Sequence, residues 1–123
     1  MKASNPRNIL GGALEECCRD PLTGFFRDGS CNTARNDLGM HTVCAILTEE
    51  FLAFSHAQGN DLSTPRAEIG FPGLRAGDRW CLCAARWAEA VEAGVAPPIV
   101  PGACHEATLE VVDIDTLRRH ALQ

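Results

Sequence analysis

The sequence lacks three features that would place a protein in a membrane, outside the cell or on nucleic acid. Its uninterrupted apolar stretches, such as residues 43–47, are far shorter than the ~20 residues of a membrane-spanning helix. Asn5-Pro6 interrupts the N-terminal segment before any apolar run typical of a signal peptide. Its arginines are scattered and its net charge is -5, so no basic stripe is present to neutralise phosphates. We therefore expect a soluble, cytoplasmic protein that binds neither membrane nor nucleic acid.

The sequence also lacks a linker and an internal repeat. Its 123 residues suit one domain with one core. The apolar fraction of 46% and the charged fraction of 22% are those of an ordinary globular protein. We expect residues 1–123 to form a single domain, with residues 1–7 as a flexible N-terminal segment.

Hydrophobic periodicity and turn residues predict three units in which a strand leads into a helix. The predicted strands are residues 41–47, 79–84 and 107–112, and the predicted helices are residues 49–58, 85–93 and 113–121. Asp28-Gly29 predicts a hairpin over residues 24–31, and residues 60–77 form a long loop. This pattern indicates an α+β fold with two layers, in which about three short helices cover one face of a small, mostly antiparallel sheet.

The sequence contains seven cysteines, a high number for a chain of 123 residues. An odd number without an export signal favours free thiols over a disulfide framework. Cys17 and Cys18 follow two glutamates, whose charge opposes thiolate formation. We therefore expect neither to be a nucleophile.

Trp80-Cys81-Leu82-Cys83 is the most distinctive local motif. In a strand, both thiols lie on one face, too far apart for a disulfide between them. They could share a metal such as zinc with other ligands, although the spacing fits no standard zinc finger. The candidate metal ligands are Cys81, Cys83, Cys31, Cys44 and His41, with His105 as a further possibility.

A second interpretation is an enzyme that uses one thiolate. Cys83 and Cys44 each come shortly before a predicted helix start, where a thiolate is favoured. The candidate base is His105 or His41. A third interpretation is a non-catalytic interaction domain in which the cysteines are small core residues.

Polar side chains gather in the loops and could contact a ligand. Residues 60–65 (Asn-Asp-Leu-Ser-Thr-Pro) combine amide, carboxylate and hydroxyl groups on a long loop, as many binding sites do. Asp28 and Asp78 can equally cap turns, and Asp37 belongs to the same polar group. The candidate ligand-binding residues are Arg27, Asp28, Asn60, Asp61, Thr64 and Arg86.

Several stretches resemble one bacterial family, a domain of unknown function (DUF2237), from Asn8 to about Leu117. They are residues 23–31, 41–45, 59–65 and 71–74, and above all Gly77-Asp78-Arg79-Trp80-Cys81-Leu82-Cys83 with Arg86-Trp87. The resemblance implies a compact two-layer domain but no activity, substrate or cofactor. It ranks Cys31, His41, Cys44, Cys81, Cys83 and His105 above Cys17 and Cys104. Cys104 stands where the family pattern has Thr, and Ala67 where it has Pro.

We expect a cleft lined by Cys and His, framed by residues 60–65 and the Cys81/Cys83 strand, that binds a small ligand or a metal. A thiolate enzyme and an interaction domain are the alternatives. The partner would be a small molecule or a protein, and a homo-oligomer is possible. The sequence assigns no enzyme class.

Overall fold

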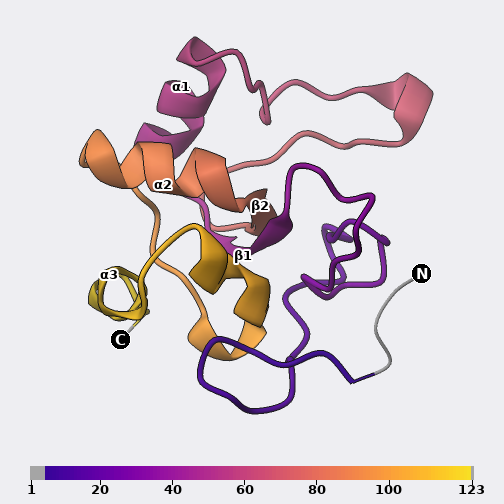
Figure 1. Cartoon of the computed structure of the whole chain (residues 1–123). Coiled ribbons are helices and arrows are strands. Elements are labelled where there is room, and N and C mark those ends of the chain that lie inside the picture. Colours follow the sequence, from indigo (N-terminus) through magenta and orange to yellow (C-terminus); the bar gives the residue numbers. More distant parts are fainter. Residues whose placement is uncertain (1–4, 123) are drawn as a thin grey trace.

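The computed structural model describes residues 5–122, and these form an α+β fold around a two-stranded antiparallel sheet (Figure 1). The flexibility expected for residues 1–7 falls in part on residues 1–4, which lie outside the described residues. For residues 5–7, the flexibility of the N-terminal segment stays a prediction. The elements in chain order are β1 (His41–Ile46), α1 (Glu49–Ala57), η1 (Ala67–Ile69), β2 (Arg79–Cys83), α2 (Ala84–Glu92), η2 (Pro101–Ala103), η3 (Glu106–Glu110) and α3 (Ile114–Arg119).

The sheet aligns the two strands that carry four of the five principal candidate metal ligands, His41, Cys44, Cys81 and Cys83. In the antiparallel register, Cys44 is the partner of Cys81, and His41 is the partner of Cys83. The register shifts between His41 and Val43, as it does where one strand carries an extra residue. Cys44 and Cys81, 37 residues apart in the chain (81 − 44), therefore lie side by side.

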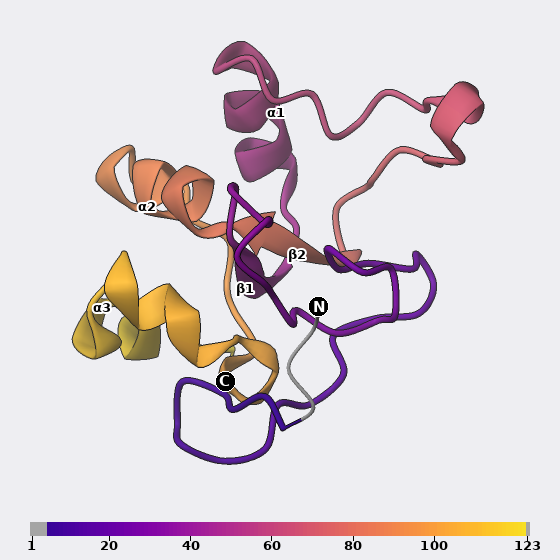
Figure 2. The same cartoon turned by 45° about the vertical axis from the view of Figure 1, so that its right-hand side comes forward.

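Each strand passes directly into a helix, as the sequence predicts. Thr48 caps α1, because its hydroxyl accepts a hydrogen bond from the backbone N–H of Phe51 at 3.1 Å. α2 begins immediately after β2, with Cys83 as its N-cap residue. α2 packs against both strands and against α1, which lies on its far side (Figures 1 and 2). The last residue of β2, Cys83, is therefore adjacent to the first residue of α2, Ala84.

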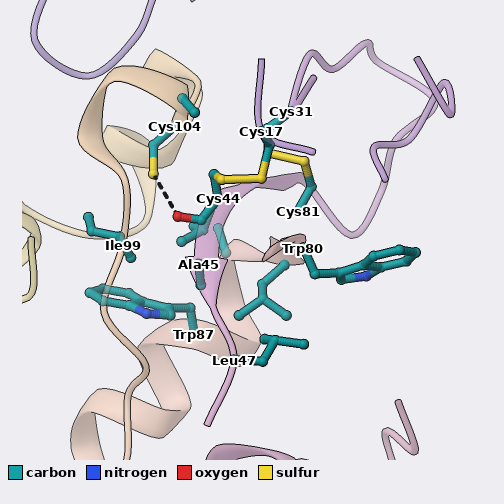
Figure 3. Packing of buried hydrophobic residues seen from close by; sticks show 14 of the residues in the cluster. Cys17, Cys31, Cys44, Ala45, Leu47, Trp80, Cys81, Trp87, Ile99 and Cys104 are labelled. Atoms are coloured by element: carbon teal, nitrogen blue, oxygen red, sulfur yellow. Dashed lines mark hydrogen bonds between the residues drawn. A yellow bond between two sulfur atoms is a disulfide. The ribbon is translucent and has the colours of Figure 1, made fainter. Parts of the chain in front are cut away.

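The core lies between the sheet and the helices. Trp87 of α2 is fully buried, and its indole Nε1 donates a hydrogen bond to the carbonyl of Pro97 at 3.1 Å. Ile99 is also fully buried and forms a bridge with Ala45 of β1. Figure 3 shows Trp87, Ile99 and Ala45 on the same side of the sheet, so the segment after α2 closes the core. Within residues 5–122 no helix has the length and apolar character needed to cross a membrane.

Two predicted strand regions have other structures. The predicted hairpin at residues 24–31 consists of turns and bends. Gly24 has a φ of +103° and Arg27 a φ of +54°, and the carboxylate of Asp28 accepts hydrogen bonds from the N–H and hydroxyl of Ser30. These local bonds occupy the groups that strand pairing would need. The hairpin prediction is therefore wrong.

The predicted strand at residues 107–112 is also wrong, because residues 106–110 form the short helix η3. His105 starts this helix by accepting the N–H of Ala107 at 3.0 Å. The hydroxyl of Thr108, fully buried, donates to the hydroxyl of Thr42 at 2.8 Å. Side-chain bonds therefore fix this segment against β1, in place of a third strand's backbone ladder.

Candidate functional site

Four cysteines form two disulfides on one side of the sheet. Cys17 is bonded to Cys44, and Cys31 is bonded to Cys81. The expectation of free thiols is wrong for these four residues. It rested on the count and on the missing export signal, whereas pairing depends on which side chains the fold brings together.

The sheet register explains why these four sulfurs meet. Cys44 and Cys81 are opposite each other on β1 and β2, and directly opposed residues of a strand pair point to the same face. The loop that carries Cys17 and Cys31 lies over this face, since the N–H of Cys17 donates to the carbonyl of Gly29 at 2.7 Å. The N–H of Cys81 donates to the hydroxyl of Thr23 at 2.8 Å and fixes the same loop to β2.

The result is a compact and dry group of sulfur atoms, which we call the sulfur centre (Cys17, Cys31, Cys44 and Cys81). The Sγ atoms of Cys17, Cys31 and Cys81 all lie within 4.8 Å of one another. The side chains are shielded from water, with exposed fractions of 5% for Cys17, 1% for Cys81 and 0% for the other two. Figure 3 shows the two sulfur–sulfur bonds side by side.

The other three cysteines are free thiols in different surroundings. Cys104 is fully buried, and burial raises the pKa of its thiol to about 12. Its Sγ donates to the carbonyl of Cys44 at 3.7 Å (Figure 3), so it is a core residue without nucleophilic character. Cys18 and Cys83 are half-buried. Of these two, Cys83 lies in a cleft.

The cleft has a volume of about 670 Å³ and lies beside β2. One wall comes from the long loop between α1 and β2, which reaches outward past the sheet (Figures 1 and 2). The opposite wall comes from the loop between Cys18 and Cys31, which contributes Phe25 and Arg27. The lining residues are Phe25, Arg27, Gly39, His41, Asn60, Asp61, Leu62, Arg66, Ile69, Phe71, Trp80, Cys81, Leu82, Cys83 and Arg86.

His41 is held rigidly in this lining. Its Nδ1 lies 2.7 Å from Oδ1 of Asp37, whose side chain is fully buried. Since a carboxylate only accepts, Nδ1 donates and Nε2 is left as the basic nitrogen. The ring stacks on Phe25 with a centroid distance of 6.4 Å. A Cβ at Gly39 would stand 2.7 Å from the ring, so the glycine makes room for the imidazole.

Cys83 is the cleft residue opposite His41. The two are register partners across β1 and β2, and its thiol is not bonded to another cysteine. Cys83 is also the N-cap residue of the nine-residue helix α2 and makes no side-chain capping bond. The N-terminal end of a helix favours an anion. Cys83 and His41 therefore line the same cleft, and His41 is bonded to the buried carboxylate of Asp37.

Cations outnumber anions in the lining. The lining contains the guanidinium groups of Arg27, Arg66 and Arg86 against the single carboxylate of Asp61. Arg27 lies over the ring of Trp80 at 5.1 Å and donates to the carbonyl of Gly24 at 2.6 Å. Among the ion pairs of residues 5–122, none includes Arg27. Its positive charge is therefore available to a ligand.

The other two arginines have exposed carboxylate neighbours. Arg66 lies 2.6 Å from Glu68, and Arg86 lies 3.5 Å from Glu89. Arg86 also donates to the carbonyl of Gln58 at 3.1 Å, which ties α2 to the end of α1. Exposed pairs of this kind are weak and exchange readily with solvent or ligand.

Asp61 shapes the loop wall. A hydrogen bond from the hydroxyl of Thr64 lowers the pKa of this carboxyl group, with smaller contributions from the N–H groups of Ser63 and Thr64. The two N–H groups lie 3.0 and 3.2 Å from its Oδ1. The charged carboxylate therefore closes a turn in the loop, the role that the sequence also allows for aspartates near glycine and proline.

The candidate residues predicted from the sequence are divided between the cleft, local turns, the start of η3 and the sulfur centre. Arg27, Asn60, Asp61, Arg86, His41, Cys81 and Cys83 line the cleft. Thr64 and Asp28 are used in local turns. His105 caps η3 outside the cleft lining, and Cys44 is bonded to Cys17. The suggested metal set is divided between the sulfur centre (Cys31, Cys44, Cys81) and the cleft (Cys83, His41).

Several residues of the site have little signal in the sequence. The acidic neighbours of Cys17 argue only against a nucleophilic thiol, and its disulfide with Cys44 is a structural role that the sequence does not specify. Asp37 appeared only as one polar loop residue, although its position four residues before His41 is a signal for contact across a turn. Arg66 has no distinctive sequence signal, whereas the aromatic residues Phe25, Phe71 and Trp80 lie in the stretches that resemble the family.

A comparison with known protein families gives a match over nearly the whole chain. The sequence matches a family described as an uncharacterized protein conserved in bacteria (DUF2237) over residues 7–121. The chain belongs to the DUF2237 family. The match includes every residue of the sulfur centre and of the cleft. A comparison with curated proteins gave no match.

Proposed function

We propose that the cleft of this DUF2237 protein binds a small organic molecule that carries an anionic group such as a carboxylate or phosphate. The observation that carries the proposal is the excess of guanidinium groups in one cavity, three against one carboxylate, in a chain of net charge -5. Because the chain as a whole repels anions, this local excess marks the place where an anion is favoured.

The size and the walls of the cleft indicate the rest of the ligand. Its volume of about 670 Å³ lies within the roughly 300–1,000 Å³ of small-molecule sites. The rings of Phe71 and Trp80 lie edge to face at 5.7 Å, and Phe25 stacks on His41. These rings offer apolar contact to a carbon skeleton, while arginine fixes the charged end.

The test is a screen of small carboxylates, phosphates and sulfonates by thermal shift, followed by calorimetry on those that raise the melting temperature. We expect binding that weakens with added salt and is lost in Arg27→Gln but retained in Arg35→Gln. Arg35 is an exposed arginine outside the cleft lining and serves as the matched control. If Arg35→Gln weakens binding as much as Arg27→Gln, the cleft is not the site.

A second candidate function is thiol-dependent acyl transfer, which the register pairing of Cys83 with His41 and the bond of His41 to Asp37 support. The thiol proton would move to Nε2 of His41 as the sulfur forms a bond to the carbonyl carbon of an ester, and the π electrons of that carbonyl would move onto its oxygen. Asp37 would stabilise the imidazolium. When the carbonyl forms again, the bond to the ester's alkoxy group would break, and that group would leave as the alcohol with the proton from Nε2. An activated ester tests this step. We expect a mass increase of one acyl group on Cys83, which Cys83→Ser abolishes and Cys18→Ser leaves unchanged.

We keep a cytoplasmic location as a proposal. A homo-oligomer is likewise a proposal that the structure of one chain does not test. The two disulfides bear on the location, because disulfides persist in oxidising compartments and are rare in a reducing cytosol. Trapping thiols with an alkylating agent in intact cells tests the proposal. In a cytoplasmic protein, we expect the four cysteines of the sulfur centre to be isolated in the thiol or metal-bound form.

A further inference from the structure

We infer that the sulfur centre is a zinc site when its two disulfides are reduced, with Cys17, Cys31, Cys44 and Cys81 as four thiolate ligands. This site is separate from the cleft. It also differs from the set that the sequence suggested, because Cys17 replaces both Cys83 and His41. The inference does not depend on the proposed ligand of the cleft.

The positions of the sulfur atoms carry the inference. In a tetrahedral site with Zn–S bonds of about 2.3 Å, neighbouring sulfurs stand roughly 3.8 Å apart. Three of the four Sγ atoms already lie within 4.8 Å of one another. The fourth, that of Cys44, is bonded to Cys17 and belongs to the same group. Four sulfur ligands in a tetrahedral arrangement favour zinc over hard cations such as magnesium.

The backbone holds the ligands independently of the disulfides. Cys44 and Cys81 are opposed in the sheet. The N–H groups of Cys17 and Cys18 both donate to the carbonyl of Gly29, at 2.7 and 3.0 Å. Thr23 accepts the N–H of Cys81 at 2.8 Å. None of these contacts involves a sulfur atom, so reduction leaves them intact and keeps the backbone at Cys17, Cys44 and Cys81 in place.

Burial makes these thiols better suited to metal than to water. All four side chains have exposed fractions of 5% or less, so a thiolate without a counter-ion would be strongly disfavoured there. Zinc supplies that counter-ion, and its binding releases the four thiol protons. Cys18 and Cys83, the half-buried thiols, lie outside the centre and provide natural controls.

The disulfide form and the zinc-bound form of the sulfur centre interconvert by reduction and oxidation. A dithiol reductant delivers two electrons and two protons to each disulfide, so two equivalents give four thiols. Zinc then displaces four protons. In the reverse direction, two equivalents of diamide, a two-electron oxidant, accept four electrons from the thiolates. Two disulfides form, and the zinc ion is released.

The experiment titrates cobalt(II), a spectroscopic substitute for zinc, into the full-length protein after anaerobic reduction and removal of the reductant. We expect one cobalt ion per chain with the intense thiolate charge-transfer band of tetrahedral sulfur coordination, and its displacement by one equivalent of zinc. Cys18→Ser and Cys83→Ser should keep this spectrum, whereas Cys17→Ser and Cys31→Ser should lose it. Diamide should then release one zinc ion per chain.

Because loss of the spectrum in a variant of the centre can also come from misfolding, a second measurement uses the reduced wild-type protein alone. Alkylation with mass-spectrometric mapping compares it with and without zinc. We expect zinc to protect Cys17, Cys31, Cys44 and Cys81 while Cys18 and Cys83 are modified at unchanged rates. Failure of the reduced wild type to bind cobalt overturns the inference. Loss of the spectrum in Cys83→Ser also overturns it, since the metal would then lie in the cleft.

Discussion

His41 and Cys83 are partners across the β1–β2 pair, and His41 contacts the buried carboxylate of Asp37 through its Nδ1. This arrangement places a basic nitrogen and a free thiol in one cleft, although 42 residues separate them in the chain (83 − 41). It gives Cys83 surroundings that Cys18, the other half-buried thiol, does not share.

Cys83 should therefore react faster with iodoacetamide than Cys18 at neutral pH. His41→Gln should slow the modification of Cys83 by roughly tenfold, which corresponds to about 1.4 kcal/mol in the barrier, because the variant removes the base. Timed alkylation with mass-spectrometric mapping measures both rates in one sample, and Cys18 is the internal control. Equal rates for the two thiols in the wild type would contradict the role given to His41.

The two disulfides should stabilise the fold by different amounts. Their sequence separations are 27 for Cys17–Cys44 and 50 for Cys31–Cys81, which correspond to about 3.5 and about 4 kcal/mol in the loop-entropy description. Urea unfolding of the Cys17→Ala/Cys44→Ala and Cys31→Ala/Cys81→Ala variants measures the losses. The two closed loops overlap between residues 31 and 44, so the combined loss should be smaller than the sum.

His105 should make the folded state less stable at mildly acidic pH. Burial lowers the pKa of this imidazole, and the nearby carboxylates of Glu106 and Glu110 oppose the change only in part. The unfolded chain then binds the proton more readily than the folded one. The contribution is present in full above the ordinary pKa of about 6.5 and is lost as the pH falls below it.

His105→Asn is the informative variant, because asparagine can still accept the N–H of Ala107 but does not titrate. The free energy of unfolding of this variant should change less between pH 7 and pH 5 than that of the wild type. Urea unfolding at several pH values measures the difference. An identical pH dependence in the two proteins would show that His105 does not contribute.

Trp87 should be the most costly aromatic residue to truncate. It is fully buried, so Trp87→Ala should lower the free energy of unfolding by about 3–5 kcal/mol. Trp87→Phe keeps most of the packing but leaves the carbonyl of Pro97 without its 3.1 Å hydrogen bond. Its cost should be smaller, about 1–3 kcal/mol. Denaturant unfolding of both variants separates packing from hydrogen bonding.

The sequence was sufficient to predict elements whose signals are local. β1, α1, β2 and α2 lie within one or two residues of their predicted bounds, because Thr48 and the glycines after the helices act over one turn. α3 also begins after its predicted cap, Asp113. The segment at 106–110 depends instead on bonds to a distant residue, such as Thr108 to Thr42. The segment at 24–31 depends on side-chain bonds such as those from Ser30 to Asp28. Hydrophobic periodicity reports neither kind of bond.

The cleft was easier to predict than the sulfur centre. Residues 60–65 and Cys83 stand out as a polar loop and a motif, and both border the cleft. The place of Cys17 depends on how its loop crosses the sheet, which the acidic neighbours Glu15 and Glu16 do not reveal. The charge of adjacent residues argues against a nucleophilic Cys17 but does not report the disulfide partner of a side chain that points into the core.

The loop between Cys17 and Cys31 is fastened at both ends, to β1 through Cys44 and to β2 through Cys81. Phe25 and Arg27, which line the cleft, lie between these two attachment points. Their segment therefore loses its conformational freedom during folding and not during ligand binding. The anion that we propose as ligand would meet an arginine already in position, so its affinity would not be reduced by the entropy of ordering that wall.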